Sequence, residues 1–83
     1  MNHELSQHAR TVMEERGIPT EWLERALHGP ARVEPDKKDP ELVHHLVVIP
    51  EHGGRVLRVV FNKQVAPWRI VTLHFDRRLK GKL

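Results

Sequence analysis

Three runs of eight residues rich in Val, Ile and Leu dominate the second half of this 83-residue chain. They read LVHHLVVI (42–49), RVLRVVFN (55–62) and WRIVTLHF (68–75), and the short linkers PEHGG and KQVAP join them. β-Branched and aromatic residues favour strands, and the paired glycines of the first linker are typical of a hairpin turn. The sequence therefore predicts an antiparallel sheet in which these three strands follow one another.

The first 30 residues show instead the apolar spacing of helices. One helix is predicted to begin after the N-cap Ser6 and to end at Gly17, which suits a left-handed residue. A second is predicted from the N-cap Thr20 to the sequence HGP (28–30), and ARVEP (31–35) is a weaker strand candidate before the loop DKKDPE. The predicted fold class is α+β, with two N-terminal helices packed on one face of a three- to four-stranded antiparallel sheet.

A chain of this length is expected to form a single domain over residues 1–83, with flexible ends at about residues 1–4 and 79–83. Cysteine is absent, which excludes disulfides and thiolate metal sites and is compatible with a reducing compartment. No apolar segment approaches the length of a membrane span or a signal-peptide core. We therefore expect a cytoplasmic protein with no membrane association.

Charge is distributed unevenly along the chain. Residues 1–41 contain six Lys and Arg against nine Asp and Glu, whereas residues 42–83 contain eight against two. The basic second half is either a solvated face that aids solubility or a binding surface for phosphates or an acidic partner.

Alternation along the strands predicts which side chains share a face. In the last strand, one face is predicted to carry Val71, Leu73 and Phe75, and the other to carry Ile70, Thr72, His74 and Asp76. In the strand before it, Leu57, Val59 and Phe61 form the predicted core set, which leaves Arg58 on the face of His74. Either His44 or His45 joins this face, and pairing through the hairpin favours His44.

Arg58 and His74 suggest the chemistry of RNA cleavage without a metal. In that reaction a base removes the 2′-hydroxyl proton, an acid protonates the leaving 5′-oxygen, and a guanidinium stabilises the charged transition state. Arg58 is the candidate for the guanidinium, and His74 and His8 are the candidate acid and base. His8 follows the start of the first helix, where the helix dipole disfavours its protonation. The alternative is a polar strand face with scattered titratable residues.

Four further cations, Arg16, Arg77, Arg78 and Lys80, are candidates to hold a nucleic-acid backbone. Three of them lie in the tail RRLKGK (77–82), which is otherwise a solvated chain end. The seven histidines do not show the spacing of a metal site, and the adjacent His44 and His45 point to opposite faces of a strand. Neither a metal nor a cofactor is predicted.

Several segments in order resemble a known family: SQHARTVMEERGI (6–18), PTEWLERALHGP (19–30), RVLRVVFN and PWRIVTLHFDRR (67–78). The chain is similar, from about Leu5 to Arg78, to the small bacterial family called domain of unknown function forty-two fifty-eight. Its members pair an S-x-H-A opening helix and an R-G-I turn with a late strand similar to V-V-T. The resemblance implies importance for the matching positions Ser6, His8, Arg16, Gly17, Arg58 and Thr72.

The layout of that family is similar to the RelE and BrnT toxins of bacterial toxin–antitoxin pairs, which are small α+β ribonucleases that need no metal. This chain departs from the RelE-like layout in having no obvious strand before the first helix, and it has no tyrosine. The first hypothesis is a toxin-type endoribonuclease that acts on RNA or the ribosome. The second is a noncatalytic module that binds nucleic acid or an acidic antitoxin-like protein, and the third is a remnant without activity. Apolar residues on the Arg58 face also suggest a homodimer.

Overall fold

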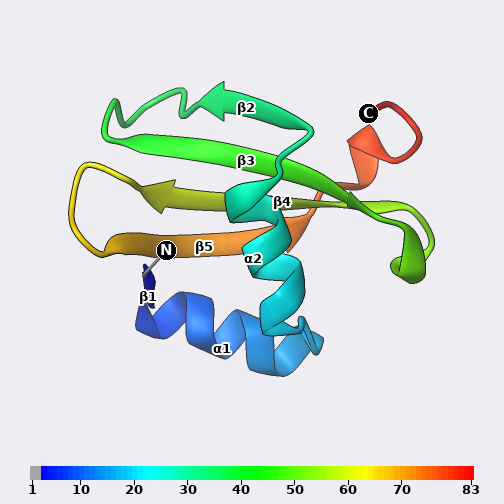
Figure 1. Ribbon diagram of the computed structural model, residues 1–83, viewed down its shortest axis with the longest axis horizontal. Coiled ribbons are helices and arrows are strands. Elements are labelled where there is room, and N and C mark those ends of the chain that lie inside the picture. The colour runs from blue at the N-terminus through cyan, green and yellow to red at the C-terminus, as the bar shows by residue number, and fades with distance from the viewer. Residues whose placement is uncertain (1–2) are drawn as a thin grey trace.

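The computed structural model describes residues 3–83, which form two helices, five strands and two short 3₁₀ helices (Figure 1). In chain order these are β1 (His3–Leu5), α1 (Gln7–Arg16), α2 (Thr20–His28), β2 (Arg32–Pro35), β3 (Leu42–Ile49), η1 (Pro50–His52), β4 (Arg55–Asn62), β5 (Trp68–Phe75) and η2 (Arg77–Leu79). The strands form one sheet in the order β1-β5-β4-β3-β2. The α+β class with two helices is confirmed, whereas the sheet has five strands rather than three or four.

The three long strands occupy the predicted ranges, and each pairs antiparallel with the next. Between β3 and β4 the chain turns through η1 and then through Gly53 and Gly54, whose φ angles are 68° and 72°. These left-handed conformations favour glycine, which explains the GG pair of the linker. β2 adds to β3 as an antiparallel edge strand.

A short strand before α1 corrects the prediction of an entirely antiparallel sheet. β1 pairs parallel with β5, with Leu5 opposite Ile70, and the Ser6 amide donates to the Ile70 carbonyl at 2.9 Å. A strand of three residues is too short for alternation to identify, so β1 could not be predicted from the pattern. A flexible end was expected at residues 1–4, but His3 and Glu4 lie in the sheet. Residues 1 and 2 lie outside the described residues.

Ser6 caps α1 as predicted. Its Oγ accepts a hydrogen bond from the Ala9 amide (3.0 Å) and donates one to the Val71 carbonyl (2.8 Å), so the cap also ties the helix to β5. Gly17 ends the helix in the left-handed conformation. The prediction for the second helix is wrong at its first residue: Pro19 is the N-cap without a side-chain bond, because its extended backbone (φ −68°, ψ 148°) suits that position and Thr20 is already helical.

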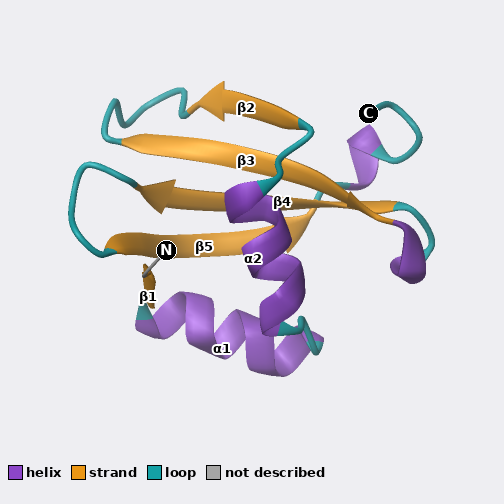
Figure 2. Cartoon of the chain, viewed as in Figure 1, coloured by secondary structure: helices purple, strands orange, loops and turns teal. Residues whose placement is uncertain are grey.

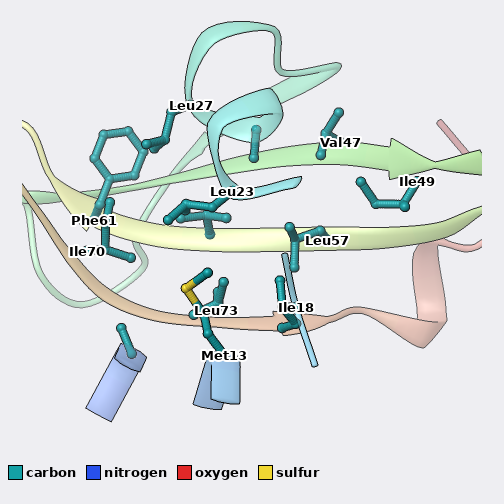
Figure 3. Close-up of a cluster of buried hydrophobic side chains, with 13 residues drawn as sticks. Met13, Ile18, Leu23, Leu27, Val47, Ile49, Leu57, Phe61, Ile70 and Leu73 are labelled. Atoms are coloured by element: carbon teal, nitrogen blue, oxygen red, sulfur yellow. The ribbon is translucent and has the colours of Figure 1, made fainter. Parts of the chain in front are cut away.

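Both helices cover one face of the sheet, where α1 contacts β5 and α2 contacts β3 and β4 (Figure 2). Within residues 3–83, neither helix is long and apolar enough to cross a membrane. Aliphatic side chains of the helices and of β3, β4 and β5 fill the space between the two layers (Figure 3). The predicted core positions on β4 are confirmed, and the fully buried side chains of this core include Leu23, Ile49, Leu57, Val59, Phe61 and Ile70.

A β-bulge corrects one predicted face of β5. Val60 lies opposite Thr72, but the next residue, Phe61, lies opposite Ile70, so Val71 has no opposite partner. The extra residue reverses the alternation toward the start of β5. Ile70 is therefore fully buried in the core beside Phe61 instead of lying on the Arg58 face.

Candidate functional site

Arg58 lies on β4 on the sheet face away from the helices, and its guanidinium makes four hydrogen bonds. Nε and Nη2 donate to Asp76 Oδ2 (3.2 and 2.9 Å), and Nη1 donates to Glu34 Oε1 (3.0 Å) and His44 Nδ1 (2.8 Å). Burial lowers the pKa of Arg58, but the bonds to Glu34 and Asp76 outweigh burial and hold that pKa above its usual value. Because a guanidinium carries five N–H groups, one N–H of Nη2 remains unused by residues 3–83.

His44 links Arg58 to the loop after β2. A guanidinium can only donate, so His44 Nδ1 accepts from Arg58 and its Nε2 carries the proton that is donated to Asp36 Oδ1 at 2.7 Å. The hydrogen bond from His44, followed by those from the amides of Asp39 and Lys38, lowers the pKa of Asp36 to about 2. These two contacts assign the donated ring proton of His44 to Nε2.

His45 takes the opposite face, which settles the choice that alternation left open. Its Nδ1 donates to the Ala26 carbonyl of α2 at 3.0 Å, and its ring packs edge-on against Phe61 with centroids 4.7 Å apart. Burial lowers the pKa of His45. This histidine therefore belongs to the helix–sheet interface and not to the Arg58 face.

Asp76 joins the end of β5 to the Arg58 network. It is only 4% exposed, and it accepts bonds from the Arg58 guanidinium and from the amide and side chain of Arg78. Burial raises the pKa of Asp76, but the hydrogen bonds from Arg78 and Arg58 more than offset burial and keep that pKa below its usual value. The Asp76 amide also donates to the Val56 carbonyl at 2.8 Å, which holds the start of η2 against β4.

His74 lies directly opposite Arg58 in the sheet, so the predicted shared face is confirmed. Its side chain is exposed, in contrast to that of His44. Partial desolvation and, after it, the positive charge of Arg58 lower the pKa of His74. An unprotonated imidazole in contact with water is therefore favoured at neutral pH.

A hollow of about 370 Å³ lies over this network, and we call it the Arg58 hollow. Half-buried Arg58 and His44 contribute to its wall, as does His74, and three exposed cations also line it: Lys37, Lys38 and Arg78. The Arg78 side chain is 86% exposed and its Nε lies 3.4 Å from Asp76, so it can turn toward a ligand. The arrangement can bind an anionic group and exchange a proton with it.

The structure separates the other predicted site residues. His8 does not line the Arg58 hollow; its Nε2 lies 3.1 Å from Thr72 Oγ1 at the side of β5. Of the four predicted backbone-binding cations, only Arg78 lines this hollow. The other three, Arg16, Arg77 and Lys80, line a second one.

Sequence reasoning missed the acidic partners and the loop lysines of the site. β2 places Glu34 opposite His44, and the following turn brings Asp36, Lys37 and Lys38 to the hollow. The alternation of ARVEP puts Val33 and Glu34 on opposite faces without saying which points inward. In the structure, Val33 is 52% exposed and Glu34 faces Arg58. The positive charge of Arg58 was therefore the signal that could have placed the Glu34 carboxylate on this face.

The side chains of residues 3–83 contain no group of three or more His, Asp or Glu that could hold a metal ion. Among known families, a model described as Domain of unknown function (DUF4258) matches residues 5–74. The matched segment runs from the end of β1 through Arg58 and His74, and it stops before Asp76. Comparisons with curated proteins and with solved structures gave no match.

Proposed function

Because the chain belongs to the DUF4258 family, whose description names no activity, we propose its function from the site itself: a metal-independent endoribonuclease of the RelE or BrnT toxin type. The observation that carries this proposal is His74, an exposed imidazole directly opposite Arg58 in a hollow that three exposed cations line. A general base must be unprotonated and accessible to its substrate, and the lowered pKa and the exposed side chain of His74 support this role.

In the proposed reaction, His74 removes the proton of a ribose 2′-hydroxyl. The 2′-oxygen attacks the adjacent phosphorus, the bond from phosphorus to the 5′-oxygen breaks, and the products are a 2′,3′-cyclic phosphate and a 5′-hydroxyl. The leaving 5′-oxygen takes its proton from solvent water in the open hollow. His8, the other predicted acid or base, has no part in this proposed reaction, because it contacts Thr72 at the side of β5 and does not line the Arg58 hollow.

The positive charge for the phosphate comes from the exposed cations rather than from Arg58. Glu34 and Asp76 neutralise the Arg58 guanidinium, which keeps one N–H for a phosphate oxygen. Lys37, Lys38 and Arg78 are exposed and line the same hollow. In this proposal Arg58 is mainly a positioning residue that fixes His44, Asp76 and the wall beside His74.

The arrangement of elements supports the RelE-like part of the proposal. The sequence departed from that layout by lacking a strand before the first helix, and β1 supplies one. Two helices then precede the antiparallel strands, as in the layout that the family resemblance implies.

A noncatalytic binding module is the second candidate, and the ion pairs of Arg58 favour it. Four of the five guanidinium N–H groups are occupied by Glu34, His44 and Asp76, so this face is already a fixed polar surface. Such a surface can bind RNA or an acidic antitoxin-like protein through Lys37, Lys38 and Arg78 without any reaction.

The test is cleavage of end-labelled single-stranded RNA by the purified protein in buffer containing EDTA. We expect products with 2′,3′-cyclic phosphate ends, and we expect His74→Gln to lower the cleavage rate by about 10²- to 10⁴-fold, the usual contribution of a general base. Induced expression of the wild type, but not of His74→Gln, is expected to arrest growth of the host.

The matched control is His28→Gln, which removes an exposed histidine at the end of α2, on the helix side of the sheet. If RNA stays intact at high protein concentration while the protein still binds it, the ribonuclease proposal is rejected in favour of the binding module. Equal cleavage by wild type and His74→Gln would remove His74 from the reaction.

A further inference from the structure

A second hollow, of about 320 Å³, is lined by four cations together with Phe75 and Asp76. Arg16 comes from the last turn of α1, Arg55 from the start of β4, and Arg77 and Lys80 from the segment around η2. Segments that are far apart in the sequence therefore place four positive charges around one space, which we call the basic hollow.

These four cations have no carboxylate partner among residues 3–83. Arg25, Arg32, Arg58 and Arg78 each form an ion pair, whereas all four cations of the basic hollow are exposed and unpaired within the described chain. The carboxylate of Asp76 does not neutralise them, because Arg58 and Arg78 occupy both of its oxygens. Like charges around one hollow repel one another, and an anion that bridges them relieves the repulsion.

An aromatic surface adjoins the cations. The ring of Phe75 lines the hollow, and the ring of His52 packs against it with centroids 4.9 Å apart. Arg55 Nη1 lies 3.4 Å from His52 Nε2, so the guanidinium borders this aromatic pair. Phe75 and His52 are each half-buried, and Phe75 lines the hollow. Cations beside aromatic rings are the combination by which proteins hold single-stranded nucleic acid: phosphates bind the charges and bases stack on the rings.

We propose that the basic hollow binds backbone phosphate of single-stranded RNA through Arg16, Arg55, Arg77 and Lys80, with a base resting on Phe75. We infer that RNA bound in the basic hollow is positioned to reach the Arg58 hollow, and this part of the proposal rests on the proposed function. Both hollows border η2, where Arg77 lines one and its neighbour Arg78 lines the other. One strand that crosses η2 therefore contacts both.

The test uses a fluorescent, single-stranded oligouridylate with 2′-O-methyl groups, whose blocked 2′-oxygen prevents cleavage. Binding is measured by fluorescence anisotropy between about 50 and 200 mM salt. We expect the double variant Arg55→Gln, Arg77→Gln to weaken binding about tenfold at the lower salt concentration. We also expect the slope of log K against log salt to fall by about 1.4, since each single-strand phosphate contact contributes about 0.7.

The control is Arg69→Gln, an exposed arginine near the other end of β5, which is expected to bind like the wild type. The pair Arg16→Gln, Lys80→Gln is expected to reproduce the loss, which separates a phosphate site from local misfolding of one double variant. Unchanged binding in both double variants, or equal losses with Arg69→Gln, overturns the proposal.

Two competitors distinguish other anions. Displacement of the oligonucleotide by polyglutamate at equal charge would assign the basic hollow to an acidic protein, and displacement by inorganic phosphate at equal phosphate concentration would assign it to a small anion. Either result overturns the RNA assignment. The probe cannot be cleaved, so this binding test does not depend on the ribonuclease proposal. If the protein proves not to cleave RNA, binding that depends on Arg55 and Arg77 still supports the RNA site.

Discussion

At the scale of single residues, Arg58 holds together the sheet face away from the helices. Its side chain is 12% exposed and that of Asp76 is 3% exposed, so the pair is largely removed from water. We expect Arg58→Met to lower the free energy of unfolding by about 3 kcal/mol, because removing one partner leaves a buried charge uncompensated. Arg78 still contacts Asp76, which keeps the loss at the lower end of the usual range. Urea denaturation measures it, with Arg69→Met as the control, and a loss below about 0.5 kcal/mol would contradict the role of Arg58.

Alternation along β4 and β5 was sufficient to predict that Arg58 and His74 share a face, and hairpin pairing correctly favoured His44. The partners of Arg58 were less accessible from sequence. Glu34 lies on an edge strand of four residues, too short for alternation to fix its inward face. Asp76 was predicted on the correct face, but its bond to Arg58 depends on how the chain leaves β5, which no local pattern specifies.

At the scale of elements, the end of α1 depends on the backbone of one glycine. Gly17 has φ +62°, and a Cβ atom there would meet nothing within 4 Å. We therefore expect Gly17→Ala to lower the free energy of unfolding by about 1 to 2 kcal/mol through backbone strain alone. Gly29→Ala at the end of α2 is the matched control. Its φ is −138°, and its Cβ would meet the Arg25 carbonyl at an ordinary 3.6 Å. Thermal unfolding of the two variants compares them, and equal losses would show that strain at Gly17 is not the cause.

The elements that sequence predicted well are those whose length gives the pattern enough repeats. The three eight-residue strands and the Ser6 and Gly17 ends of α1 fall in this group. β1 has three residues and pairs with β5, so it depends on tertiary contact rather than on local preference. The bulge beside Phe61 is similarly invisible, because a shift of one residue in pairing leaves the composition of both strands unchanged.

At the scale of the whole molecule, the two faces of the sheet respond to pH through different groups. On the helix side, His45 is buried and its pKa is lowered. On the same side, the hydrogen bond from Arg25 of α2 lowers the pKa of Glu51 in η1 to about 2. On the other face, hydrogen bonds from His44 and from backbone amides lower the pKa of Asp36 to about 2. All of these shifts favour the unprotonated form in the folded state, so each makes the unfolded state bind protons more readily as the pH falls.

The free energy of unfolding is therefore expected to decrease with acidification in two stages. His45 and His74 contribute stability that is fully present above their usual pKa of 6.5 and is lost as the pH falls toward their lowered folded values. Asp36 and Glu51 contribute stability that is present above their usual values, 3.8 and 4.5, and is lost as the pH falls through about 2. Urea midpoints measured from pH 8 to about pH 2 test this. His45→Asn keeps a donor for the Ala26 carbonyl but removes the titration of His45, so it should reduce the upper stage to the part that His74 contributes and leave the lower one unchanged. An upper stage of undiminished size in His45→Asn would mean that its proton uptake comes from histidines outside the helix–sheet interface, and the acid sensitivity of this fold would then lie on the Arg58 face.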